Sequence, residues 1–267
     1  SEIADLPDSF SARLRISGKC LLDLVLNFAY IFEVSEAETI AMGYTPENKD
    51  DFIETVQIEA PTQSAPIVCI MDSGVQEEHK YLAPSISSDE SISLLPNNTS
   101  TSDEVAGGGH GTRVAGAVLY PKAVPLDGVY QLPCWIRNMR ILDENNCLPE
   151  SVYPPKAIAI AVQKYNVENQ IPTKIFNHSI GSHRPCEMKH MTPWAAEIDS
   201  QSYNHDVLFI QAAGNISTDV ISAYWQAGYP YPEYLDRELC RISNPAQSLQ
   251  AITVGSVSAD ELETDDF

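Results

Sequence analysis

Apolar runs of strand length recur along the chain from residue 66 onward, and stretches of helical period separate them. The strands expected from these runs are "IVCIM" (67–71), "WIRNMRIL" (135–142), "TKIFNHSI" (173–180), "VLFIQAA" (207–213) and "AITVGSV" (251–257). Because most of these runs are continuous or nearly so, they are typical of parallel strands covered on both faces. The helices expected between them are one that follows His110, "PKAIAIAVQKY" (155–165) and "PWAAEIDSQSYN" (193–204). The order predicts an α/β fold, in which a mostly parallel sheet is flanked by helices and joined by right-handed crossovers.

Residues 1–60 have a different pattern and are expected to form a small N-terminal α+β accessory unit. A strand, a helix and a second strand, forming a compact βαβ unit, are expected at 11–17, 18–29 and 30–39. The acidic stretch 46–66 carries three prolines and is typical of a linker. The second domain then spans residues 61–267.

Three polar residues lie at the carboxyl ends of predicted strands or beside them, which is where open α/β sheets bind ligands and carry catalytic residues. Asp72 ends the first run, His110 lies where a loop becomes a helix, and Asn215 follows "QAAG" after the fourth run. A carboxylate, an imidazole and an amide donor can orient a base, move a proton and stabilise an oxyanion. Taken alone, Asp72 and Asn215 each fit the pattern of a turn residue at least as well as that of a catalytic residue. The interpretation therefore depends on the three residues together.

The surroundings of His110, "AGGGHGTRVAGAVLY" (106–120), indicate crowding of the backbone around the imidazole, because glycine tolerates close approach and left-handed geometry. Small residues such as Gly116 should let the following helix lie close to other backbone. A helix start disfavours a cation, so we expect it to favour a neutral imidazole. Asp103 and Glu104, before the glycines, are expected to be solvated loop charges.

In this order the motifs resemble those of the subtilisin-like serine proteases, the subtilase family. "IMDSG" is similar to the family's aspartate motif, "HGTRVAG" to its histidine motif and "AAGN" to its oxyanion asparagine. "NHSIGS" (177–182) resembles the segment that lines the S1 pocket and pairs with substrate backbone, which implies substrate-binding roles for Ser179, Ile180 and Gly181.

The resemblance covers residues 66 to 267 and implies a serine endopeptidase that acts on polypeptides through an Asp-His-Ser triad. Asp72, His110 and Asn215 would be the aspartate, the base and the oxyanion donor. Calcium is a cofactor that the family often binds, although the sequence has no D-x-D-x-D-G loop from which to name ligands. The strand–helix–strand pattern near the N-terminus is also similar to a subtilase propeptide.

The sequence departs from the family at the nucleophile. Family members carry a serine in a G-T-S-M-A type string at a helix start, and no such string is present here. We therefore expect the 267-residue chain alone to be inactive, and we favour truncation over a natural pseudo-protease. A truncation would expose apolar core and favour self-association. The alternative is a catalytically dead module that binds extended peptides along "NHSIGS".

The composition limits the classes of partner that the chain is expected to bind. With 37 acidic against 16 basic residues, the formal charge of −21 argues against binding to nucleic acid or to anionic membranes. The sequence contains no run of about 18 apolar residues, so no membrane-spanning helix is predicted. The six cysteines form no CxxC pair and the six histidines no ligand spacing, so we name no metal site. Free thiols favour a reducing, cytoplasmic location, while the start at Ser1 leaves a removed signal peptide and secretion open.

Overall fold

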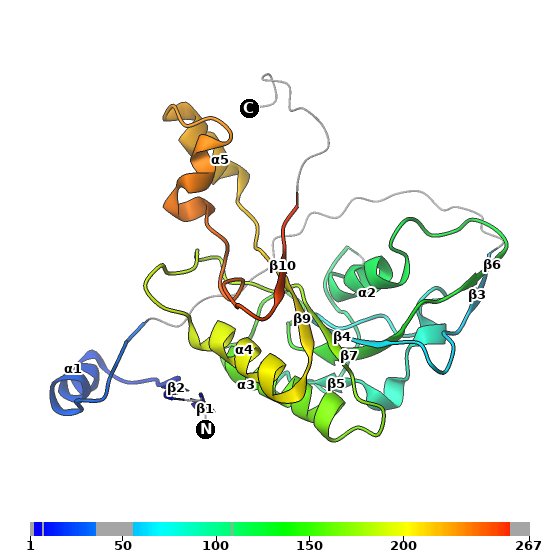
Figure 1. Cartoon of the computed structure of the whole chain (residues 1–267), viewed down its shortest axis with the longest axis horizontal. Helices are drawn as coiled ribbons and strands as arrows, with labels where there is room; N and C mark the ends of the chain where they lie inside the picture. Colours follow the sequence, from blue (N-terminus) through cyan, green and yellow to red (C-terminus); the bar gives the residue numbers. More distant parts are fainter. Residues whose placement is uncertain (1–2, 7, 36–55, 108, 257–267) are drawn as a thin grey trace.

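A computed structural model describes residues 3–6, 8–35, 56–107 and 109–256 of the chain, and its centre is a six-stranded sheet (Figure 1). The strand order is β10-β9-β8-β4-β7-β5, and every neighbouring pair is parallel. The strands are β4 (Ile67–Asp72), β5 (Ile92–Ser93), β7 (Trp135–Arg140), β8 (Ile175–His178), β9 (Leu208–Ala212) and β10 (Ile252–Val254). The prediction of a mostly parallel sheet is confirmed. A separate parallel pair joins β3 (Gln57–Glu59) to β6 (Val129–Gln131).

Helices cover both faces of this sheet (Figure 1). On one face lies α2 (Gly111–Leu119), and on the other lie α3 (Pro154–Val162), which continues as a π-helical turn (Gln163–Val167), and α4 (Pro193–His205). All three helices coincide with expected ones. Short 3₁₀ turns at Ala83–Ser85 and Ser88–Glu90 connect the strands on the β5 side.

The structure also has a helix that the sequence analysis did not expect, α5 (Thr218–Gln226). It begins at Ser217, whose hydroxyl accepts a hydrogen bond from the Val220 amide, and none of its residues is buried. Together with the 3₁₀ turns Glu233–Asp236 and Glu238–Cys240 it projects away from the sheet (Figure 1).

The alternation of side chains along β4 divides the core into two clusters. Val68 and Ile70 face α2, whereas Cys69 and Met71 face α3 and α4. Because side chains in a strand alternate, Asp72 at the end of β4 lies on the α2 side. This register decides which helix the carboxylate meets.

The N-terminal segment differs from its expected βαβ arrangement. β1 (Ile3–Asp5) and β2 (Phe10–Ala12) form an antiparallel hairpin, and α1 (Gly18–Asn27) follows with no buried residue. Residues 30–35 have no strand, so the expected second strand is wrong over that range; residues 36–39 and most of the expected linker lie outside the described residues. Strand β2 pairs with the preceding strand β1 and not with a strand after α1, because a hairpin needs a much shorter connection than a crossover does. The division of the chain near residue 60 stays a prediction.

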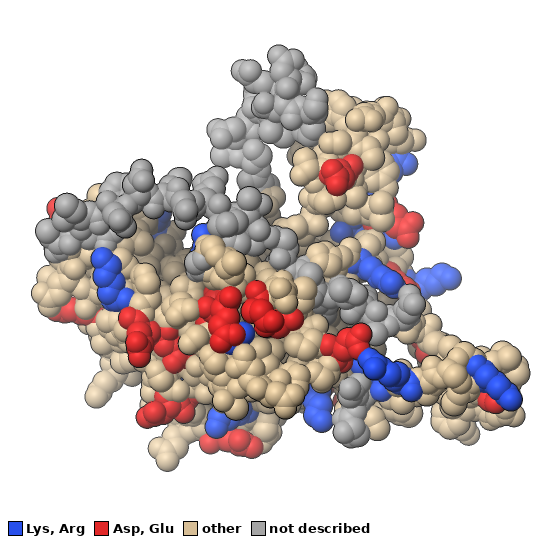
Figure 2. All heavy atoms as spheres, turned by 180° about the vertical axis from the view of Figure 1, so that it is seen from behind, with Lys and Arg blue, Asp and Glu red and all other residues tan. Residues whose placement is uncertain are grey.

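Three further properties concern the membrane, the cysteines and the surface charge. Among the described residues, no helix has the length and apolar character needed to cross a membrane. All six cysteines are free thiols in the structure. On the face shown in Figure 2, Asp and Glu side chains gather over the middle of the molecule, and Lys and Arg side chains are scattered between and around them.

Candidate active site

Asp72 and His110 are in direct contact at the carboxyl end of β4. His110 Nδ1 lies 2.6 Å from Asp72 Oδ1, and the Ser73 amide donates to the same oxygen at 2.8 Å. The Asp72 side chain is fully buried, whereas 18% of the His110 side chain is exposed. The structure therefore places a buried acid behind an imidazole that solvent reaches, and the imidazole precedes α2 directly, at its N-cap position.

The surroundings of His110 raise its pKa. Burial by itself lowers the pKa of this imidazole, but the hydrogen bond to Asp72, the charge of Asp72 and the charge of Asp103 outweigh it. The expectation that the helix start would favour the neutral ring is wrong, because a carboxylate in contact acts more strongly than the partial charge of a helix end. The ring of His110 is thus a stronger base than a free histidine.

A second carboxylate, Asp103, organises the loop around His110, although the sequence analysis expected it to be solvated. Its side chain is buried, with Oδ1 accepting from the Ser73 hydroxyl at 3.0 Å and Oδ2 from the Thr112 amide at 2.9 Å. The Ser73 hydroxyl in turn accepts from the Gly111 amide at 2.9 Å. Asp103 was missed because the partners that tie it to the site, Ser73 and Thr112, come from the turn after β4 and from α2 and not from its own loop.

The glycines beside His110 are explained by close contacts. A Cβ on Gly111 would lie 2.2 Å from the Gly74 carbonyl oxygen, and one on Gly109 would lie 2.0 Å from Asp103 Oδ2. Gly109 also has a φ of +77°, which disfavours other residues. Gly116 is different, since a Cβ there would meet nothing within 4 Å. The expectation that Gly116 lets the helix approach other backbone is wrong.

The predicted substrate segment follows β8, the strand that pairs with β4 on the side away from β7. Ser179 accepts a hydrogen bond from the Asn177 amide group at 2.8 Å, and Gly181 is buried. The side chain of Ile180 is fully buried in the core cluster under α3 and α4. Ile180 is therefore a core residue, and within the segment only Ser179 is partly exposed.

Asn215 lies three residues beyond the end of β9, at the same edge of the sheet as Asp72. β9 is two strands from β4, which is a separation of roughly 10 Å at ordinary strand spacing. The side chain of Asn215 is exposed, and the structure shows no hydrogen bond from it to Asp72 or His110. The turn is fixed by Gly214, whose φ is +99° and whose Cβ would lie 2.1 Å from Ser243 Oγ.

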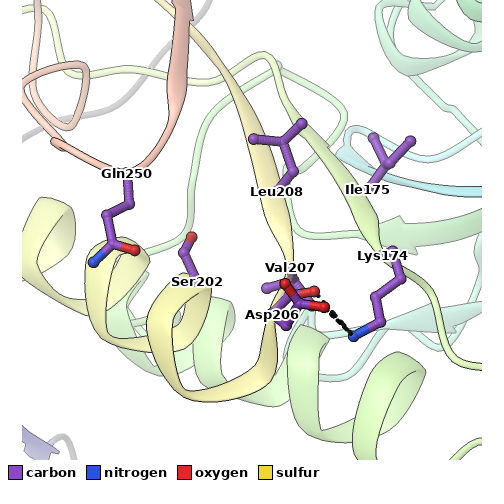
Figure 3. Close-up of a pocket in the computed structure, with 7 residues that line it drawn as sticks. All are labelled: Lys174, Ile175, Ser202, Asp206, Val207, Leu208 and Gln250. Atoms are coloured by element: carbon purple, nitrogen blue, oxygen red, sulfur yellow. Dashed lines mark hydrogen bonds and ion pairs between the residues drawn. The ribbon is translucent and has the colours of Figure 1, made fainter.

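A cavity of about 500 Å³ lies elsewhere (Figure 3). Its lining includes Ile175 and Leu208, the first residues of β8 and β9, so it opens at the amino-terminal edge of the sheet. Lys174 closes one side through an ion pair with Asp206 at 3.4 Å (Figure 3). This cavity is at the opposite edge from Asp72 and belongs to a different surface.

Glu33, Glu187 and His190 form a group of metal-ligating side chains that sequence spacing did not indicate. Their ligand atoms lie within 4.8 Å of one another. Calcium takes six to eight oxygen ligands, and this group offers two partly exposed carboxylates and an imidazole nitrogen. It therefore does not fit the calcium that the family resemblance suggested.

Comparison with known families identifies the family of the chain. The sequence model of the peptidase S8 family, described as the subtilase family, matches residues 63–267. The chain belongs to the subtilase family. No curated protein matches it.

Solved structures of subtilisin-like proteases resemble this subtilase chain distantly. The epidermin leader peptide processing serine protease of Staphylococcus aureus is 20% identical, with a TM-score of 0.44 over 74% of this chain and 47% of its own. A lanthipeptide protease is 21% identical, with a TM-score of 0.48 over 72% and 48%. A psychrophilic subtilisin-like protease from an Antarctic Pseudoalteromonas is 20% identical, with a TM-score of 0.45 over 70% and 35%. The subtilase chain thus spans half or less of the length of these structures.

Substitution of the two helix glycines separates crowding from helix propensity. Gly111→Ala should destabilise the protein by about 2 kcal/mol or more, because the new methyl group must displace backbone. Gly116→Ala, on the same helix but in open space, should stabilise it by about 0.5–1 kcal/mol. Urea unfolding of both variants measures the difference. Equal effects of the two substitutions would contradict the contact at Gly74.

The pKa of His110 provides a second prediction. Asp72→Asn should lower it most, because the carboxylate supplies both a hydrogen bond and a charge, and Asp103→Asn should lower it less. Titration of the His110 ring protons by NMR measures both, with the exposed Asp89→Asn as the charge-matched control.

The sign for stability follows from the raised pKa. The contribution of His110 to the free energy of unfolding is fully present below the unfolded pKa of about 6.5 and is lost as pH rises through the folded pKa.

In the NMR titration, a His110 pKa in Asp72→Asn that equals or exceeds the native value would show that Asp72 is not the main partner of His110.

Proposed function

We propose that this subtilase chain carries the acid, base and oxyanion-donor groups of a subtilisin-type serine endopeptidase site. The observation that carries the proposal is the 2.6 Å contact between Asp72 Oδ1 and His110 Nδ1, with the carboxylate buried and the imidazole partly exposed. Because Nδ1 faces the acid, the ring presents Nε2 as its second nitrogen for proton transfer. The segment 179–181 and Asn215 belong to the same carboxyl edge of the sheet.

In this proposal each group has one role in acyl transfer. His110 Nε2 takes the proton of a serine hydroxyl as its oxygen attacks the substrate carbonyl carbon, and later gives that proton to the leaving amine. Asp72 holds the imidazole in the required tautomer and stabilises the imidazolium. Asn215 donates its amide N–H to the oxyanion, a contact whose loss costs about 10²–10³ in kcat in subtilisin. The main chain at 179–181 pairs with the extended substrate.

The serines near this site are occupied by structural roles. The Ser73 hydroxyl is buried between Asp103 and the Gly111 amide, and the Ser179 hydroxyl accepts from Asn177. With no serine string of the family type in its sequence, the 267-residue chain should lack acyl-enzyme chemistry. In subtilisin, loss of the nucleophile costs about 10⁶ in kcat.

Labelling tests this part of the proposal. The 267-residue chain should not react with a serine-directed fluorophosphonate at micromolar concentrations, as read by mass spectrometry of the intact protein. A denatured sample is the control for non-specific reaction. Stoichiometric labelling of one serine in the folded chain, abolished by His110→Ala, would mean that the nucleophile is already present.

Kinetics test the roles of the named residues. In a form of the protein that includes a nucleophilic serine, Asp72→Asn should lower kcat for peptide hydrolysis by about 10⁴, as the same change does in a related triad. Asn215→Ala should lower kcat by about 10²–10³ with little change in KM. Peptide binding without hydrolysis in that form would instead identify a peptide-binding module.

We also propose self-association through the edge of the sheet at β10. Among the described residues β10 is an edge strand, and Ile252, Val254 and the nearby Leu249 are exposed. An exposed edge with apolar side chains is a template for pairing with another chain. Light scattering over a range of concentrations should show a mass above that of one chain, and a single-chain mass at high concentration would overturn the proposal. Val254→Lys should shift the equilibrium toward the monomer.

A further inference from the structure

A polar pair stands in the apolar layer between the sheet and helices α3 and α4. His178 and Gln211 are register partners on β8 and β9, and their side chains are 1% and 0% exposed. On the same face, Phe176 stacks on Phe209 with ring centroids 5.1 Å apart, and Trp194 packs edge-on against the His178 ring at 5.3 Å. Burying polar groups in such a layer costs free energy unless each is hydrogen-bonded. The pair therefore needs a reason beyond filling space.

The hydrogen bonds of the pair fix the orientation of both side chains. The Gln211 amide nitrogen donates to the carbonyl oxygens of Ile180 at 2.8 Å and Ala212 at 3.0 Å, so its oxygen faces His178. His178 Nδ1 lies 2.6 Å from that oxygen, and an amide oxygen only accepts, so the imidazole donates. Burial lowers the pKa of His178 to about 4, which keeps the ring neutral above that pH. The Gln211 amide is thus held from both ends.

These bonds lie just beyond the point where the ladder between β8 and β9 ends. His178–Gln211 is the last register pair of the two strands. After it the chain continues on one side into the segment 179–181 and on the other through Ala212 toward Asn215. The Gln211 amide therefore links Ile180 to the end of β9 beyond the β8–β9 ladder, beside the main-chain bonds that tie Ser182 to Asn244 and Ala213 to Ser243 and Val254.

We propose that His178 and Gln211 act as a clamp that sets the position of the main chain at 179–181 relative to the Asn215 turn. His178 orients the Gln211 amide, and the amide ties the Ile180 carbonyl to the end of β9. Both are positioning residues, because neither is placed to touch a substrate. The significance for substrate binding rests on the proposed function, whereas the clamp itself is a statement about main-chain order.

The competing explanation is that the pair contributes only stability, and a double substitution separates the two. His178→Leu alone leaves the Gln211 oxygen buried without its donor, which is destabilising. His178→Leu combined with Gln211→Met replaces both side chains by apolar groups of similar size, so neither side chain is left unpaired, but the buried Ile180 carbonyl loses its donor and the variant should still be less stable than the native protein. The pattern of amide exchange separates the two explanations, because loss of the clamp accelerates exchange next to the pair, whereas a general loss of stability accelerates it throughout the domain.

Amide hydrogen exchange on the 267-residue chain measures the clamp directly. In the double variant, amides in 179–182 and 212–216 should exchange at least about tenfold faster than in the native protein, while amides in α2 stay unchanged. His178→Asn, whose amide nitrogen replaces the Nδ1 donor, should restore native exchange. Exchange in the double variant within about twofold of native would overturn the proposal. Should the double variant not fold, Gln211→Met alone is measured in the same way.

Binding of a dye-labelled hexa-alanine peptide separates the clamp from the proposed function. Such a peptide offers main-chain hydrogen bonds and almost no side-chain contacts, so it reports on the edge at 179–181. If the native chain binds it, the double variant should bind about tenfold more weakly and His178→Asn should bind as the native chain does. If the native chain does not bind it while exchange in the double variant is accelerated, the peptide-binding edge of the proposed function is wrong and the clamp stands.

Discussion

The buried contact between Asp72 and His110 is the constraint on which the rest of the site depends. Burial of a carboxylate is costly unless it is paired and hydrogen-bonded, and here the Ser73 amide and the imidazole bind Oδ1, while Oδ2 is buried without a hydrogen-bond partner among the described residues. To bring the imidazole this close, the start of α2 must approach the turn after β4 until only glycine fits at Gly111. Asp103 then fills the space behind the turn and ties it to the helix. Removal of any one of these contacts would leave another buried polar group without its partner.

Two histidines show how strongly the surroundings decide the chemistry of one residue type. His110 lies against carboxylates, and its pKa is raised in spite of burial. His178 lies against a neutral amide in an apolar layer, and its pKa falls to about 4. The first is suited to accept a proton during catalysis, and the second is suited to remain neutral and to orient Gln211. His110 is held against Asp72 at the end of β4, and His178 is the last residue of the neighbouring strand β8. One sheet therefore supports a proton-transfer group at its carboxyl edge and a rigid polar pair in its core.

Much of the fold was predictable because its causes are local. Continuous apolar runs predicted β4, β7, β8, β9 and β10, and helical period predicted α2, α3 and α4, whereas the short strands β3, β5 and β6 were not predicted. The hairpin of β1 and β2, the unburied α5 and the role of Asp103 were not predictable in this way. The hairpin and the buried Asp103 depend on which partner a segment meets, and that partner is not encoded in the segment's own residues. The same limit applies to Ile180, which is expected to contact substrate but is fully buried in the core.

The sequence by itself determined the order of the elements, the family motifs and the residue types available for acid–base chemistry, since apolar period and glycine spacing are properties of short segments. Only the tertiary structure decided that Asp72 meets His110, that Asp103 is buried behind them, and that His178 pairs with Gln211. These contacts join residues 30 to 40 positions apart, and they follow from strand register and from which helix covers which face of the sheet. Register is set by the packing of the whole core, so no single segment contains it.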